Sequence, residues 1–205
     1  EVGQFVSRFA LRRNIDIQIV ANQEWDRQEN GASVLKAQAF IDEPFVLLMT
    51  DHIFEEATLG DLLKEPVPAD ELVLAVDFNT SDNKLIDIHD VTKVLDRGTR
   101  IDDIGKNIKE YNAFDTGMFL CPPDLFRVLE KNCREGDSSL SGAVKAYAGA
   151  GKARIFDIKK RSWMDIDTRA DQKKAKKLLW GSLVKPHDGW ISKTINRKFS
   201  TLFFT

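Results

Sequence analysis

Three aspartates in two short stretches have the side chains and spacing that metal-assisted phosphate chemistry requires. Asp51 ends an apolar run at residues 45–50, and Asp165 and Asp167 lie two positions apart in WMDIDT. Residues two apart in an extended segment project from the same face. Mg²⁺ is usually held by one or two carboxylates, with water and substrate phosphate completing its octahedron. The aspartates therefore predict a Mg²⁺ site; the alternatives are a turn cap at Asp51 and a helix N-cap at Asp167 and Thr168.

Alternating strands and helices must position these aspartates. The strands are mostly apolar on both faces, which is typical of a parallel sheet covered by helices on both sides. We therefore predict an α/β fold with a mostly parallel, Rossmann-like sheet and helices on both faces, in which ligands bind at the carboxyl ends of strands. Strands are expected at 15–20, 45–51, 71–78, 113–121 and 153–158, a hairpin at 93–106, and helices at 31–41, 58–64, 123–133, 139–151 and 168–180.

Composition excludes several classes of protein. A chain of 205 residues can bury a substantial core. Its formal net charge of −2 argues against a broad nucleic-acid-binding surface. The two cysteines, Cys121 and Cys133, suit neither a zinc cluster nor a disulfide framework, which is typical of a reducing cytosol. No apolar run approaches the roughly 20 residues of a membrane-spanning helix.

The stretches VLLMTDHIF, NAFDTGMFL and WMDIDTRADQKKAKKLL, in this order, resemble the sugar-nucleotidyltransferase family with its nucleotide-diphospho-sugar transferase fold. The likeness is greatest to its CTP:inositol-1-phosphate cytidylyltransferases and covers residues 1–180, predicted as one domain. It implies an enzyme that uses Mg²⁺, CTP and inositol 1-phosphate to make CDP-inositol and pyrophosphate. The family's Gly-rich loop and following Lys have no counterpart here. Because the chain opens within a helical pattern, we expect an upstream segment to be missing.

The resemblance also implies roles for individual residues. Asp51 and Asp167 would be the catalytic metal ligands, with Asp165 as a second-shell or alternate ligand. Substrate would be bound by Asn30, Gly31 and Ser33 at a helix start, by His52, by Lys106, and by Asp115, Thr116 and Gly117. Ordinary structural roles are the alternatives: a plain helix N-terminus, a polar loop histidine, a solvated surface lysine, and a turn before a strand.

The basic C-terminal part has a separate prediction. Between residues 169 and 198 there are nine Lys or Arg against two Asp. Residues 181–205 resemble the beginning of a membrane CDP-alcohol phosphatidyltransferase domain, which implies a bifunctional enzyme making an inositol phosphodiester. The present domain would then be cytoplasmic and membrane-associated, without a nucleic-acid partner, and a homodimer is compatible with the resemblance. A helix with a solvated basic face is the simpler interpretation of this part.

Two further functions stay open. One is a nucleotidyltransferase that acts on another alcohol or sugar phosphate for phospholipid head-group synthesis. The other is a non-catalytic module for nucleotide binding or membrane recruitment, which the absent Gly-rich loop would fit.

Overall fold

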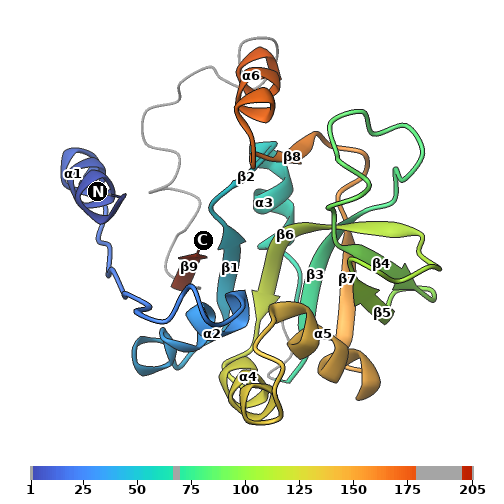
Figure 1. Cartoon of the computed structure of the whole chain (residues 1–205), viewed down its shortest axis with the longest axis horizontal. Coiled ribbons are helices and arrows are strands. Elements are labelled where there is room, and N and C mark those ends of the chain that lie inside the picture. Colours follow the sequence, from blue (N-terminus) through green and yellow to red (C-terminus); the bar gives the residue numbers. More distant parts are fainter. Residues whose placement is uncertain (1, 67–69, 179–199, 205) are drawn as a thin grey trace.

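A mixed seven-stranded sheet forms the body of the protein (Figure 1). The computed structural model describes residues 2–66, 70–178 and 200–204. Strand β6 is the centre of the sheet: it pairs with β3, with β1 and, near its beginning, with β4. The strands are β1 (Phe45–Met49), β3 (Leu72–Asp77), β4 (Lys93–Asp96), β5 (Ile101–Gly105), β6 (Ala113–Cys121), β7 (Ala153–Asp157) and β9 (Ser200–Phe204).

The α/β class is confirmed, but the sheet is mixed, so the prediction of a mostly parallel sheet is wrong in this respect. Strand β6 runs antiparallel to β1, β3 and β4, and β4 and β5 form an antiparallel hairpin. The parallel pairs are β3 with β7 and β1 with β9. The error has a physical reason. A continuous apolar run indicates burial on both faces of a strand, but it carries no information on the direction of the strand.

Helices cover both faces of the sheet, as predicted. Helices α2 (Asn30–Leu35), α4 (Leu125–Arg134) and α5 (Leu140–Gly149) contribute to one buried cluster. Helix α3 (Glu56–Leu62) contributes to the other. Alternate residues of β1 and β3 enter the two clusters: Phe45 and Leu47 face the first, and Val46 and Leu48 the second. This alternation explains why neither face of these strands is polar.

The N-terminal part differs most from the prediction. The strand expected at residues 15–20 is wrong: this segment follows helix α1 (Val2–Arg13) as irregular chain, and Ile17 and Ile19 are exposed. Alternation of apolar and polar residues favours a half-buried strand, but a strand also needs a neighbour, and none pairs with this segment within the described part of the chain. The helix expected at 31–41 breaks into α2 and a short 3₁₀ helix at Gln38–Phe40.

The C-terminal helix is close to its predicted position. Helix α6 spans Arg169–Leu178, and Thr168 caps it as expected. The Thr168 hydroxyl accepts a hydrogen bond from the Asp171 amide at 3.2 Å, and the Asp171 carboxylate accepts one from the Thr168 amide at 3.1 Å. These two reciprocal bonds satisfy amides that the first turn of a helix leaves free.

The predicted membrane domain at 181–205 falls largely outside the described residues, which end at 178 and resume at 200. Its described portion, β9, pairs in parallel with β1. Within the part of the chain that was described, no helix has the length and apolar character needed to cross a membrane. The assignment of 181–205 to a second domain stays a prediction.

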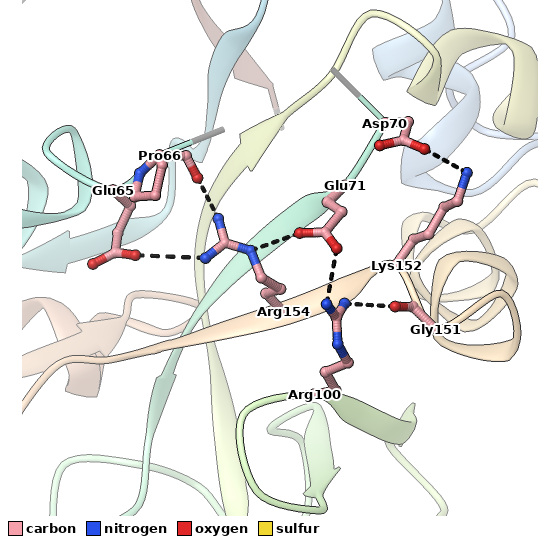
Figure 2. A network of polar contacts seen from close by, with 8 residues as sticks. All are labelled: Glu65, Pro66, Asp70, Glu71, Arg100, Gly151, Lys152 and Arg154. Atoms are coloured by element: carbon pink, nitrogen blue, oxygen red, sulfur yellow. Dashed lines mark hydrogen bonds and ion pairs between the residues drawn. The ribbon is translucent and has the colours of Figure 1, made fainter. Parts of the chain in front are cut away.

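An ion-pair network fixes the end of the sheet where β3 and β7 begin (Figure 2). Glu71, which precedes β3, lies 2.9 Å from Arg154 in β7 and 2.9 Å from Arg100 at the tip of the β4–β5 hairpin. Lys152 pairs with Asp70 at 2.7 Å. The network joins three segments that are distant in sequence. It lies at the amino ends of β3 and β7.

Candidate active site

A two-stranded sheet brings the predicted aspartates together. Strand β2 (His52–Phe54) is separated from β1 by two residues and pairs antiparallel with β8 (Trp163–Asp165), with His52 opposite Asp165. The pairing continues where the Ile166 amide donates to the Asp51 carbonyl oxygen at 2.9 Å. Figure 1 shows β2 and β8 beyond the carboxyl end of β1, below helix α6. Backbone hydrogen bonds, rather than the edge of the large sheet alone, therefore set the distance between the two acidic segments.

These segments border a cavity of about 190 Å³. Strand β6, the loop before β4, the residue after β5, and the first turns of α2 and α5 complete its walls. The predicted site residues that line the cavity are Asn30, Asp51, His52, Lys106, Asp115, Gly117, Asp165 and Asp167. Predicted residues from five different parts of the chain thus meet at one place, although the sequence identified each from its own local motif.

Three predicted site residues do not line this cavity. Thr116 is fully buried, and its hydroxyl donates to the Ala75 carbonyl oxygen at 2.8 Å, which joins β6 to β3. Ser33 accepts a hydrogen bond from Asn22 at 2.9 Å. Gly31 packs tightly, because a Cβ there would come within 2.6 Å of the Ser138 carbonyl oxygen. In the structure these three residues have structural contacts, and their predicted contact with substrate stays a prediction.

Asp90, which the sequence analysis did not single out, joins the acidic group. Its carboxylate lies with those of Asp165 and Asp167 so that one oxygen from each falls within 4.8 Å of the others. Asp90 belongs to the long polar loop between β3 and β4, and its side chain also pairs with Lys106 at 2.5 Å. Together with Asp51, these residues form an acidic group of four aspartates at the cavity, which Asp115 also borders.

The pKa values of Asp165 and Asp167 are raised, whereas the hydrogen bond from Lys106 lowers the pKa of Asp90. The pKa of Asp167 is raised first by burial and then by the negative charges of Asp165, Asp90 and Asp51. Burial is also the main cause that raises the pKa of Asp165. One Asp51 oxygen is buried and has no hydrogen-bond partner among the described residues. Like charges held together in this way favour a bound proton or cation.

The donors fit a hard cation. All four side chains offer carboxylate oxygens, the ligands that Mg²⁺ prefers, and Asp51 Oδ1 is buried with no hydrogen bond among the described residues, its contact with His52 Nε2 being 3.8 Å. The cavity opening leaves room for water and phosphate oxygens, which Mg²⁺ usually retains. The predicted ligands Asp51, Asp165 and Asp167 are thus suitably placed, and their binding of Mg²⁺ stays a prediction.

His52 is held in one orientation at the side of the cavity. Its Nδ1 lies 2.8 Å from the Thr116 carbonyl oxygen, and its ring lies 5.7 Å from the Trp163 ring. Because a carbonyl oxygen only accepts, the ring carries a proton on Nδ1, and Nε2 lies 3.8 Å from Asp51 Oδ1. Gly117 has a φ of +74°, and a Cβ there would overlap the His52 ring. Glycine is therefore required at 117 both by the backbone conformation and by the histidine.

Asp115 lies beside His52 at the start of β6. Burial raises its pKa to about 6, although the Gly117 amide donates to its carboxylate at 2.8 Å and His52 opposes the shift. At neutral pH the group is ionised and can accept hydrogen bonds from hydroxyl groups of a ligand in the cavity. A carboxylate in such surroundings is costly to the fold, and residues of this kind cluster at functional sites.

We expect the substitution Asp115→Asn to stabilise the protein at pH 8 but not at pH 4. Raising the pKa from 3.8 to about 6 means that ionised Asp115 costs the folded state about 3 kcal/mol above pH 6. This cost disappears below the unfolded pKa, and Asn never incurs it. The difference in melting temperature between variant and wild type should therefore increase as pH rises from 4 to 7. A difference that stays constant over this range would contradict the assignment.

Comparison with known proteins agrees with this geometry. No family model matches the chain. The chain is 32% identical over 198 residues to the bifunctional IPC transferase and DIPP synthase of Aquifex aeolicus. The aligned residues make up 96% of this chain and 43% of that protein. It is 30% identical over 196 residues to the protein of the same name from Thermococcus kodakarensis. Here the aligned residues make up 94% of this chain and 42% of that protein. The chain thus spans less than half the length of these curated relatives.

Solved structures show the same fold. The inositol-1-phosphate CTP transferase from T. maritima matches with a TM-score of 0.76 and 24% identity, over 88% of this chain and 74% of that chain. A putative glucose-1-phosphate thymidylyltransferase from Bacillus anthracis matches with a TM-score of 0.66 and 14% identity, over 86% and 71%. The fold, the order of the motifs and the relatives agree: the chain has the fold of the nucleotidyltransferases among the solved structures, and over almost its whole length it is similar to proteins named bifunctional IPC transferase and DIPP synthase.

Proposed function

We propose that this chain transfers a cytidylyl group from CTP to inositol 1-phosphate, giving CDP-inositol and pyrophosphate. The observation that carries the proposal is the similarity, over almost the whole chain, to the bifunctional IPC transferases. The cavity supports it, because four carboxylates, Lys106 and Asp115 meet there. Such a set can hold a cation, a phosphate and hydroxyl groups at once.

The cavity residues form two groups: an acidic side, which would bind the cation, and an acceptor side, which would bind the acceptor substrate, inositol 1-phosphate. Asp51, Asp165 and Asp167 would hold Mg²⁺, which when bound neutralises triphosphate charge and stabilises the charge that develops on pyrophosphate. On the acceptor side, Lys106 places a positive charge where a phosphate monoester can bind, and Asp115 can accept hydrogen bonds from ring hydroxyls. His52 lies between the two sides, with Nε2 3.8 Å from Asp51 Oδ1.

The chemistry requires the acceptor phosphate to attack the α-phosphorus of CTP. A new P–O bond forms to the acceptor oxygen as the bond between the α-phosphorus and its bridging oxygen breaks. The electron pair of that bond leaves on pyrophosphate. Neither reactant must lose a proton in this step when the acceptor phosphate is ionised, so positioning and charge stabilisation are what the residues supply.

The proposal extends to the organisation of the whole protein. The curated relatives are named for two activities, and this chain covers 43% and 42% of two of them. We propose that the described domain supplies the nucleotidyl transfer, and that the second activity belongs to a membrane domain beginning at 181–205. The product of the first reaction, a CDP-alcohol, would be the substrate of the second.

Pyrophosphate release tests the proposed function directly. The full-length gene product is incubated with each pair from a panel of nucleoside triphosphates and phosphate monoesters, and pyrophosphate is measured by a coupled assay. We expect CTP with inositol 1-phosphate to give the fastest turnover. Faster turnover with a hexose phosphate and UTP, GTP or dTTP would assign the protein a different substrate in the same family. Absence of turnover with every pair, from a folded preparation, would contradict the proposal.

A further inference from the structure

Asp90 has two competing sets of neighbours. On one side its Oδ1 lies 2.5 Å from Lys106 Nζ. On the other, its carboxylate lies within 4.8 Å of ligand oxygens of Asp165 and Asp167. In this structure the carboxylate of Asp90 is therefore paired with the positive charge of Lys106, although it also lies close to the carboxylates of Asp165 and Asp167. A phosphate bound to Lys106 would compete with Asp90 for the same charge.

The pair between Asp90 and Lys106 is of a kind that breaks easily. The two side chains are 51% and 56% exposed, respectively, and exposed ion pairs contribute little net free energy because water screens them. The backbones of both residues are anchored: the Asp90 amide donates to the Asp87 carbonyl oxygen at 3.1 Å, and the Lys106 carbonyl oxygen accepts from Lys93 at 2.7 Å. Side-chain rotation alone can therefore separate the pair without moving the chain.

We propose that Asp90 is an exchangeable counter-ion, which pairs with Lys106 when no acceptor is bound and joins Asp165 and Asp167 at the cation when a phosphate monoester occupies Lys106. The inference rests on the proposed function, since it concerns the same acceptor and metal subsites. Asp90 would thus link the acceptor and metal subsites, as a partner of Lys106 in one state and a ligand of the cation in the other. Because binding linkage is reciprocal, the phosphate must strengthen cation binding by the same factor as the cation strengthens phosphate binding.

The first test measures the acceptor alone. Inositol 1-phosphate is titrated into the protein by calorimetry in the presence of a chelator, so that no divalent cation is bound. We expect Asp90→Asn to bind it about threefold to fivefold more tightly than wild type, because Lys106 loses its competitor. A residue that contacted the acceptor would give the opposite sign. Unchanged or weaker binding by Asp90→Asn would overturn the exchange.

The second test measures the coupling. Mn²⁺, a paramagnetic substitute for Mg²⁺, is titrated by electron paramagnetic resonance with and without saturating inositol 1-phosphate. In wild type we expect the acceptor to tighten Mn²⁺ binding about fivefold or more. In Asp90→Asn this factor should fall to twofold or less, because only the charge of the phosphate itself remains. A factor equal to that of wild type would overturn the proposal.

Two further variants remove the remaining ambiguity. Lys106→Met frees Asp90 from its partner, so Mn²⁺ should bind more tightly without acceptor, and the acceptor should add nothing. Asp70→Asn breaks a comparable exposed pair, with Lys152 at 2.7 Å, at the other end of β3, and should match wild type in both titrations (Figure 2). Neither titration uses nucleotide. Retained coupling in Asp90→Asn with normal turnover would therefore reject the exchange alone, whereas no binding of Mn²⁺ or acceptor to wild type would reject the proposed site with it.

Discussion

Replacement of Asp51 or Asp167 by Asn should lower nucleotidyl transfer by roughly a hundredfold or more, while the protein stays folded. Each substitution keeps the size of the side chain and removes one negative charge from the acidic group. Removing one group that stabilises the charge developing in a transition state typically lowers the rate by a factor on the order of 10²–10³. The measurement is the rate of pyrophosphate release by the full-length protein at saturating CTP, inositol 1-phosphate and Mg²⁺.

The same variants should be no less stable than wild type when a chelator removes divalent cations. The reason is that burial and, after it, the mutual repulsion of the acidic group raise the pKa of Asp167 in the folded protein. Two charges about 4 Å apart repel by about 1 kcal/mol in water and by more at lower effective dielectric. Loss of one charge therefore relieves the metal-free fold, and the melting temperature measured in chelator should stay equal or rise.

The double variant distinguishes a shared metal site from two separate roles. If Asp51 and Asp167 hold one ion, the loss of either already disables it, and the double variant should be hardly slower than the single variants. Asp124→Asn removes an aspartate that pairs with Arg127 outside the cavity, and it should leave turnover unchanged. Multiplicative losses in the double variant, or near-normal turnover in either single variant, would show that Asp51 only caps a turn.

The sequence predicted those parts of the fold that have strong local signals. Strand β6 has its predicted bounds, because a mostly apolar segment of nine residues that ends before Pro122 and Pro123 suits a largely buried strand. The hairpin of β4 and β5 was predicted from the Arg97–Gly98 turn, where Gly98 has a φ of +80°. The motifs around Asp51 and Asp167 can also be identified from a few neighbouring residues. Both aspartates border the cavity, in agreement with the prediction that they lie close together.

Features that depend on distant contacts could not be predicted in this way. Asp90 lies in a polar loop with several other acidic residues, and only the folded chain distinguishes it by its approach to Asp165. Strands β2 and β8 have three residues each, too few for a periodic pattern, yet their pairing places Asp51 beside Asp165. Ser33 and Thr116 have suitable side chains, but their hydrogen bonds are made with the protein itself.

Asp77 connects the site to the core, and Asp77→Asn should destabilise the protein strongly. Its side chain is 1% exposed and accepts three hydrogen bonds: from the Asn79 amide at 2.9 Å, from Asn83 at 2.9 Å and from the Trp163 indole at 3.0 Å. An Asn side chain has one oxygen, so its amide group must face a donor at one of these positions. Leaving buried donors unpaired costs about 1–3 kcal/mol each.

We therefore expect the melting temperature of Asp77→Asn to fall by roughly 6–12 °C, since about 3 kcal/mol corresponds to this range in a chain of this size. The position of Asp77 gives the substitution a second effect. Trp163 lies in β8, two residues before Asp165, and Asn83 lies in the loop that carries Asp90, so one carboxylate holds both sides of the acidic group. Below the melting transition, Mn²⁺ binding should weaken by about tenfold.

Glu71→Gln is the matched control, because it removes a carboxylate charge at the opposite end of the same strand. Glu71 pairs with Arg100 and Arg154, so this variant should also lose stability (Figure 2). Its ion pairs do not reach β8 or the loop before β4, and its Mn²⁺ affinity below the melting transition should equal that of wild type. Equal weakening of Mn²⁺ binding in both variants would mean that affinity simply follows global stability. Weakening in Asp77→Asn alone would show that the buried carboxylate positions the acidic side chains through Trp163 and Asn83.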